Sequence, residues 1–184
     1  MTTISKSSFS QKLVELNQLD FKRWIFQRGM DFGSHEKWWY PPTGKRSRKH
    51  EGLDFCCYED RKGKLVNLTE KTIVPVMYDG IVVKIFADLL GHSIIVKHDV
   101  HDKENNLYSI YAHTLPVASL QTGSRIQAGE PIAMICATGK KNIRPHLHLS
   151  VIWALGSAVN DLDWKSMHKE KRVTLCNPMD FLLP

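Results

Sequence analysis

Two stretches of this sequence carry most of what it says about fold and chemistry, His50-Glu51-Gly52-Leu53-Asp54 and His146-Leu147-His148. On a β-strand, side chains two or four positions apart lie on the same face. The histidine and aspartate at the two ends of the first stretch would then share a face, and Gly52 between them adds no side chain to crowd a ligand. The two histidines of the second stretch would share a face as well. A helix would also make the first pair neighbours, but Gly52 and the Phe-Cys-Cys-Tyr run at 55–58 favour an extended chain.

Side chains of these types are suited to hold a metal ion. Zinc is bound by imidazole nitrogen and carboxylate oxygen, and a catalytic zinc site keeps one position open for water. Three of the four side chains would complete a His-Asp-His site and leave the fourth for proton transfer or electrostatic work. Because the chain contains 9 histidines, either stretch alone would be weak evidence. A further motif between them, Tyr111-Ala112-His113, strengthens the interpretation.

Taken together and in this order, the motifs resemble those of the M23 (LytM/lysostaphin-type) zinc endopeptidases. The resemblance covers about residues 48–154 and includes a glycine-flanked turn between the second and third motifs. The matching segments are His50-Glu51-Gly52-Leu53-Asp54-Phe55, Tyr111-Ala112-His113, Gly123-Ser124-Arg125-Ile126-Gln127-Ala128-Gly129-Glu130 and Pro145-His146-Leu147-His148, with Asn177-Pro178 near the end.

The resemblance implies a mainly β fold in which an antiparallel sheet of the LytM type forms a groove. It implies that one Zn²⁺ per chain is bound by His50, Asp54 and His148. It further implies that His113 and His146 handle the attacking water and the transition state. The implied substrates are the stem or cross-bridge peptides of bacterial peptidoglycan, cut by a metal-activated water.

Two other functions remain open from the sequence. The first is a catalytically silent binding or activating module of the same family, which is disfavoured because all five site positions are filled. The second is a phosphocarrier of related β architecture with a paired histidine site. A phosphocarrier has no need of Asp54 and would not be expected to bind zinc tightly, so metal content separates it from the other two.

One loop departs from the family pattern. Family members usually carry a small loop rich in Gly, Ser and Thr before Pro-His-Leu-His, whereas this chain has a bulkier, basic loop at 138–144. We expect Lys140, Lys141 and Arg144 to engage carboxylates of the substrate peptides. Tyr40, in an aromatic stretch ahead of the first motif, is a further candidate for substrate contact.

The first 46 residues are interpreted as an N-terminal extension, and residues 47–184 as the M23-like domain. Apolar residues recur with a loose helical period between positions 13 and 25, which predicts one or two short helices. A basic run at 45–49 lies directly before the first motif and is a candidate for the rim of the substrate site.

From residue 50 onward the pattern is typical of β-structure. Runs rich in β-branched and aromatic residues at 93–98 and 108–113 predict a strand pair, with a polar hairpin loop at 99–106. Four further histidines lie near Gly, Asp or Lys and are expected at the surface: His92, His98, His101 and His168.

Composition limits the remaining possibilities. The chain has 184 residues with 42% hydrophobic composition, enough for one good core. The net charge of +6 favours anionic partners. No run of aromatic and arginine side chains resembles a base-stacking platform, so nucleic acid is not expected. No signal peptide and no membrane span are expected either, although the family suggests a periplasmic or extracellular location. Location and oligomeric state are therefore left open.

Overall fold

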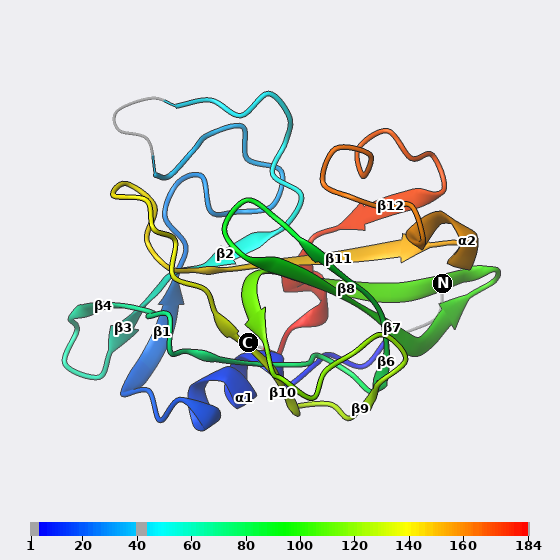
Figure 1. The fold of residues 1–184 in the computed structure, drawn as a ribbon. Coiled ribbons are helices and arrows are strands. Elements are labelled where there is room, and N and C mark those ends of the chain that lie inside the picture. Colours follow the sequence, from blue (N-terminus) through cyan, green and yellow to red (C-terminus); the bar gives the residue numbers. More distant parts are fainter. Residues whose placement is uncertain (1–3, 40–43, 184) are drawn as a thin grey trace.

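The computed structural model describes residues 4–39 and 44–183 and is built mainly from antiparallel strands (Figure 1). Its elements, in chain order, are α1 (Phe9–Leu16), β1 (Phe21–Ile25), β2 (Leu53–Phe55), β3 (Cys57–Asp60), β4 (Leu65–Asn67), β5 (Ile73–Pro75), β6 (Gly80–Ala87), β7 (His92–Asp102), β8 (Asn105–Pro116), β9 (Arg125–Ile126), β10 (Pro131–Ile135), β11 (Leu147–Ala154), α2 (Gly156–Val159), β12 (Val173–Cys176) and the 3-10 helix η1 (Pro178–Phe181). The mainly antiparallel β fold predicted from the sequence is confirmed.

The larger of the two sheets carries the candidate site. Its main path runs in the order β12-β11-β8-β7-β6-β9, while β2 pairs with β11 and β10 pairs with both β5 and β8. The strand β11 therefore lies between β8 and β2 where it begins, at Leu147–Leu149. The position of β11 brings three segments that are far apart in the sequence onto neighbouring strands.

The predicted pair of strands at 93–98 and 108–113 is confirmed as β7 and β8, but both strands are longer than expected. The polar segment at 99–106 continues the ladder, with His101 opposite Asn106 and Asp102 opposite Asn105. Lys103 has a positive φ of 55°, as a residue in a tight hairpin turn often does. Backbone pairing does not require apolar side chains, so a polar sequence continues the strands into the projecting hairpin seen in Figure 1.

The helical prediction for the first 46 residues is half right. Residues 9–16 form α1, whose buried Phe9 and Leu13 are one helical turn apart. Residues 21–25, also expected as helix, instead form β1, which pairs with β3 in a small sheet of order β1-β3-β4. Aromatic packing favours the strand, because Trp24 contacts Phe21, Tyr58 and Phe55 at ring-centroid distances of 4.9–6.1 Å.

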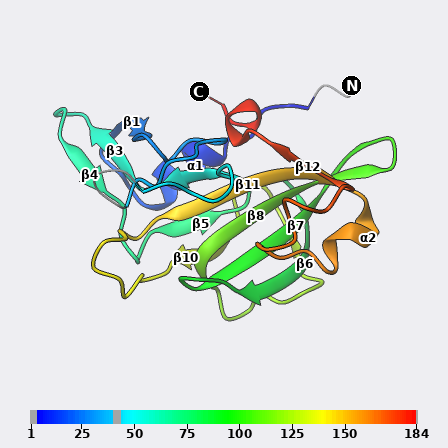
Figure 2. The ribbon, with the colours of Figure 1, turned by 90° about the horizontal axis from the view of Figure 1, so that it is seen from above.

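The N-terminal elements and the large sheet share one hydrophobic core. Phe9 of α1 packs against Phe55 and Tyr111, with ring centroids 5.8 and 6.2 Å away. The side chain of Asn17 caps the edge of β5, accepting from the Ile73 amide at 2.7 Å and donating to its carbonyl at 2.9 Å. In Figure 2, α1 and the small sheet lie together beside β5 and β11. Residues that precede the first motif in the sequence therefore form part of the hydrophobic core of the large sheet.

One of the four histidines expected at the surface is buried. His98 is 1% exposed, and its ring nitrogens lie 3.2 Å from the Asp79 carbonyl oxygen and 2.7 Å from Ser109 Oγ. Burial lowers its pKa to about 4, so the neutral ring is part of the core. The prediction failed because alternation along β7 turns His98 inward, whereas its polar neighbours in sequence indicated a turn.

In the part of the chain that the structure describes, no helix has both the length and the apolar character needed to cross a membrane.

Candidate metal centre

Strand register brings residues of the first and third motifs together. On β11, His148 lies directly opposite Asp54 of β2 and, on its other side, directly opposite Ala112 of β8. Residues opposite one another on antiparallel strands project from the same face of the sheet. The side chains of Asp54 and His148 therefore meet because of the register itself. His113 comes directly after Ala112 on β8, so this histidine is brought to the same part of the sheet.

His50 reaches the same point without belonging to a strand. We expected an extended strand through 50–54, but β2 begins only at Leu53. The backbone of His50 pairs with the segment before it, accepting from Gly33 at 2.8 Å and donating to Ser34 at 2.9 Å. The chain bends at Gly52, where an added Cβ would lie 2.7 Å from His148 Nε2 and closer still to the Leu149 carbonyl oxygen.

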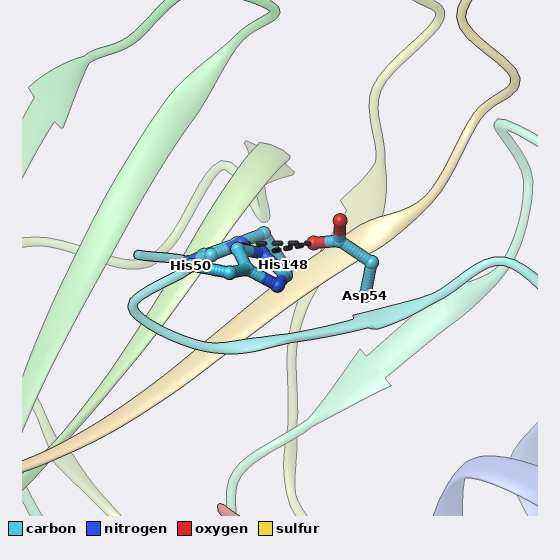
Figure 3. A group of neighbouring side chains, drawn as sticks. All are labelled: His50, Asp54 and His148. Atoms are coloured by element: carbon cyan, nitrogen blue, oxygen red, sulfur yellow. Dashed lines mark hydrogen bonds and ion pairs between the residues drawn. The ribbon is translucent and has the colours of Figure 1, made fainter. Parts of the chain in front are cut away.

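The donor atoms of His50, Asp54 and His148 form a tight triangle (Figure 3). His50 Nε2 lies 3.0 Å from His148 Nδ1 and 3.2 Å from Asp54 Oδ1, and the third side is 2.8 Å. Two ligands bound tetrahedrally to zinc at about 2.0–2.1 Å would lie roughly 3.3 Å apart. The triangle is thus slightly smaller than one face of a zinc coordination sphere, and the three side chains are at most 7% exposed.

Hydrogen bonds at the far ring nitrogens support this fit. His50 Nδ1 donates to the Asp31 carbonyl oxygen at 3.0 Å, because a carbonyl can only accept. His148 Nε2 lies 2.9 Å from Ser150 Oγ, which can accept from it. Such bonds place the ring proton on the nitrogen that points away and leave the inward nitrogen free as a ligand. The donor set and its outer partners therefore fit a zinc ion.

The other oxygen of Asp54 is held by two residues that our sequence interpretation did not include in the site. Asp54 Oδ2 accepts from Trp38 Nε1 at 2.7 Å and lies 3.4 Å from Arg46 Nη2. Burial alone would raise the pKa of Asp54, but the neighbouring histidines hold it well below its usual range. The only sequence signal was the aromatic and basic character of the segment before His50.

The structure places His113 and His146 beside this triangle. Their ring centroids are 4.9 Å apart, and His146 Nε2 is 4.0 Å from Asp54 Oδ1. His146 Nδ1 donates to the Arg144 carbonyl oxygen at 2.8 Å, so its Nε2 faces the triangle without a proton. Burial lowers the pKa of His146 to about 4. His113 Nδ1 is 3.1 Å from Asp88 Oδ1.

All five site side chains line one cavity of about 620 Å³. The apolar lining of this cavity includes Trp39, Phe86, Leu89 and Trp164. The Trp164 ring packs edge-on against that of His148, with centroids 5.0 Å apart. In Figure 1 the loop before β2, which carries Trp39, and the loop between α2 and β12, which carries Trp164, both lie above the large sheet, at the upper left and the upper right.

Of the residues expected to bind substrate, the three that the structure describes, Lys140, Lys141 and Arg144, are not among the residues that line this cavity. Lys140 and Lys141 are exposed on their loop. Arg144 donates to Asn67 Oδ1 at 2.7 Å and to Gln27 Oε1 at 2.9 Å, and its guanidinium lies over the Trp38 ring. Tyr40 lies outside the described residues. Contact between these four residues and a substrate stays a prediction.

Comparison with known proteins establishes the family. The sequence model of Peptidase family M23 matches residues 48–161, well over half of the chain, and the chain belongs to this family. The resemblance inferred from the motifs is confirmed. No curated protein sequence matches the chain.

Solved structures with the same fold include lysostaphin. The catalytic domain of this antimicrobial peptidase from Staphylococcus simulans superposes with a TM-score of 0.57 at 19% identity, covering 96% of this chain and 98% of that one. A longer lysostaphin chain from the same organism gives a TM-score of 0.56 at 19% identity, covering 99% of this chain and 55% of that one. This chain spans about half the length of the longer lysostaphin. At such identity, the likeness concerns the fold.

Proposed function

We propose that this protein is a zinc-dependent endopeptidase that hydrolyses peptide bonds in the stem or cross-bridge peptides of bacterial peptidoglycan. The observation that carries the proposal is the convergence of His50 Nε2, Asp54 Oδ1 and His148 Nδ1 in a buried triangle that lines a cavity. Two more histidines beside the triangle supply groups for proton transfer. Membership of a peptidase family supports the reaction class.

The three triangle residues would hold the zinc ion. Zinc bound in such a site lowers the pKa of a coordinated water to about 7 and polarises the carbonyl of the scissile bond. Asp54 keeps its second oxygen for Trp38 and Arg46, so the carboxylate is held in one orientation. The hydrogen bonds of His50 to a carbonyl oxygen and of His148 to Ser150 fix the ring orientations in the same way.

His113 and His146 are the residues that we assign to proton transfer and to stabilisation of the developing negative charge. His146 presents an unprotonated Nε2 towards the triangle, because its Nδ1 proton is bound to the Arg144 carbonyl oxygen. A neutral imidazole with a free nitrogen can accept a proton from water that it contacts. His113 lines the same cavity from β8, with its ring next to that of His146.

The choice of peptidoglycan rests on likeness and on charge. Lysostaphin, which has the same fold, is described as an antimicrobial peptidase. The net charge of +6 would attract an anionic wall polymer over a distance. Trp39 and Trp164 give the cavity flat apolar walls, against which a peptide backbone can pack.

The test is product analysis with purified peptidoglycan. The protein is loaded with one equivalent of zinc and incubated with sacculi from several bacteria, and the soluble products are identified by mass spectrometry. New peptide termini would establish hydrolysis and identify the bond that is cut. The His148→Ala variant should release none, whereas His101→Ala, which changes an exposed histidine outside the site, should behave like the unmodified protein.

Metal content measured on the same samples distinguishes the alternatives. Stoichiometric zinc without cleavage of any sacculus would overturn the endopeptidase and favour a silent binding module. Absence of zinc binding, with phosphate transfer to a histidine, would favour the phosphocarrier.

A further inference from the structure

His113 is held in place by a single carboxylate, that of Asp88. Its ring nitrogen Nδ1 lies 3.1 Å from Asp88 Oδ1, and its backbone nitrogen donates to Asp88 Oδ2 at 2.9 Å. His113 has a positive φ of 63°, a conformation that residues with a Cβ adopt at a cost. Two bonds from one side chain to both the backbone and the ring stabilise this conformation.

Asp88 is itself fixed by its surroundings. It follows β6, and its Oδ1 accepts from the amides of Leu90 and Gly91, both at 2.9 Å. Its Oδ2 accepts from Ser93 Oγ at 2.7 Å. The side chain is only 1% exposed. The bonds to Leu90 and Gly91 stabilise the turn between β6 and β7, but the turn does not need the bonds to His113.

A chain of contacts connects this carboxylate with Trp164, which lines the same cavity. Ser93 Oγ, which donates to Asp88, accepts from Trp164 Nε1 at 2.9 Å. Trp164 packs against the ring of His148. Asp88 therefore lies at a fixed place relative to the triangle, and so does any residue that it holds.

The proton on the His113 ring is determined by this partner. An ionised carboxylate can only accept hydrogen bonds. Burial alone would raise the pKa of Asp88, but His113 and Ser93 hold it below its usual range, so the group is ionised at neutral pH. The proton then lies on Nδ1, and Nε2 carries the lone pair. The His113 side chain, 18% exposed, is the most accessible of the four site histidines.

We propose that Asp88 is the positioning residue of the site: it selects the Nδ1-protonated tautomer of His113 and orients its free Nε2 into the cavity. The catalytic meaning of this arrangement rests on the proposed peptidase function. The arrangement itself does not rest on that function, because the tautomer and the orientation of the His113 ring can be measured in a protein that cleaves no substrate. Nothing in the sequence near Asp88 indicated this role, because it lies 25 positions before its partner.

Two substitutions separate positioning from the role in the turn. In Asp88→Ser, the hydroxyl can still accept from the turn amides, more weakly, but is too short to reach His113. In Asp88→Asn, the amide oxygen can take the place of Oδ1 and still accept from Nδ1, while the bond to the His113 backbone is lost. The matched control is Asp60→Ser, because Asp60 also accepts from two turn amides, those of Lys62 and Lys64.

The first readout is the tautomer, measured by long-range ¹H–¹⁵N NMR of the histidine rings in the zinc-loaded full chain near neutral pH. The His113 signal is assigned by its absence in His113→Ala. We expect Nδ1 protonated in the unmodified protein, in Asp88→Asn and in Asp60→Ser, and a mixture or reversal in Asp88→Ser. An unprotonated Nδ1 in the unmodified protein, or the same tautomer in Asp88→Ser, would overturn the proposal.

The second readout is kinetic. Asp88→Ser should lower kcat on isolated muropeptides on the order of 10–100-fold, the range typical for loss of a residue that orients a site side chain. KM and zinc content should not change, and Asp88→Asn should recover part of the loss. Equal losses in Asp88→Ser and Asp60→Ser would show that only folding is affected and would overturn the proposal. If no variant cleaves any muropeptide, the peptidase function fails, and the NMR result alone decides the positioning role.

Discussion

Trp38 Nε1 donates a hydrogen bond of 2.7 Å to Asp54 Oδ2, the carboxylate oxygen that points away from His50 and His148. The Trp38 ring also packs edge-on against that of His146, with centroids 5.0 Å apart. A residue from the segment before the first motif thus contacts both a candidate ligand and a candidate catalytic histidine.

The Trp38 bond should contribute to metal affinity. Trp38→Phe keeps a ring against His146 but removes the N–H donor, so the Asp54 carboxylate loses a partner that orients it. We expect zinc to bind about 10–100-fold more weakly, measured by competition with a chromophoric chelator. Trp24→Phe is the control, because Trp24 Nε1 donates to Ser10 Oγ, away from the site. Equal affinities in the two variants would contradict the prediction.

Gly52 should tolerate no side chain. In Gly52→Ala the new Cβ would lie 2.7 Å from both His148 Nε2 and Ser150 Oγ, so β2 and β11 must separate or His148 must turn. We expect the free energy of unfolding to fall by about 1–3 kcal/mol, as for other overpacked sites, and zinc content to fall well below stoichiometric. Thermal unfolding and metal analysis test this prediction. In Gly156→Ala the nearest atom would be 3.9 Å away, and this variant should match the unmodified protein in both measurements.

His98 should make the metal-free protein less stable in mild acid. Its pKa is about 4 when folded and about 6.5 when unfolded. A depressed folded pKa means that the stability contribution is present above pH 6.5 and is lost as the pH falls towards 4. The part of the loss between pH 7 and pH 5 that is due to His98 should be about 2 kcal/mol, measured by urea unfolding as the difference between the unmodified protein and His98→Gln.

Two substitutions test whether His98 causes this loss of stability. His98→Gln should be less stable at pH 7 but show a smaller drop between pH 7 and pH 5. His101→Gln changes an exposed histidine and should keep the full drop. An unchanged drop in His98→Gln would mean that other groups cause the acid sensitivity.

The basic residues of the loop at 138–144 should have two different roles, one in stability and one in substrate binding. Arg144 connects the loop to Gln27 and Asn67, so Arg144→Ala should lower the free energy of unfolding by about 1 kcal/mol. Lys140 and Lys141 are exposed, so their joint replacement by Gln should leave stability unchanged. If the lysines engage substrate carboxylates, the same replacement raises KM for muropeptides with little change in kcat. An unchanged KM would remove them from the substrate site.

Much of the candidate site could be predicted because it depends on short-range features. His146 and His148 are two positions apart, and Gly52 lies between His50 and Asp54, so local geometry and the order of motifs were informative. The register that brings Asp54 opposite His148 is not local. The family motifs nevertheless imply the arrangement of those strands, so the sequence could indicate that Asp54 and His148 lie together.

The parts that were missed depend on contacts between distant segments. Trp38 and Asp88 are each held against the site by the fold, and neither lies in a recognisable motif. The β1 segment carries a loose helical period, and its pairing with β3 overrides that preference. His98 was misjudged because neighbouring polar residues do not show which face of a strand a side chain occupies.

Arg46 belongs to the segment before the first motif and contacts Asp54, while its other nitrogen is bound to the carbonyl oxygens of Gly29 and Glu36. Metal binding and the order of this segment are then thermodynamically linked, since a ligand that binds only the folded site stabilises every contact the site requires. At a free zinc concentration about 1,000-fold above the dissociation constant, that stabilisation reaches about 4 kcal/mol. The Arg46 amide, bound to the His35 carbonyl oxygen at 2.7 Å, would then exchange its hydrogen more slowly with solvent when zinc is present. Through this linkage, a backbone position outside the ligand set reports whether the site is filled.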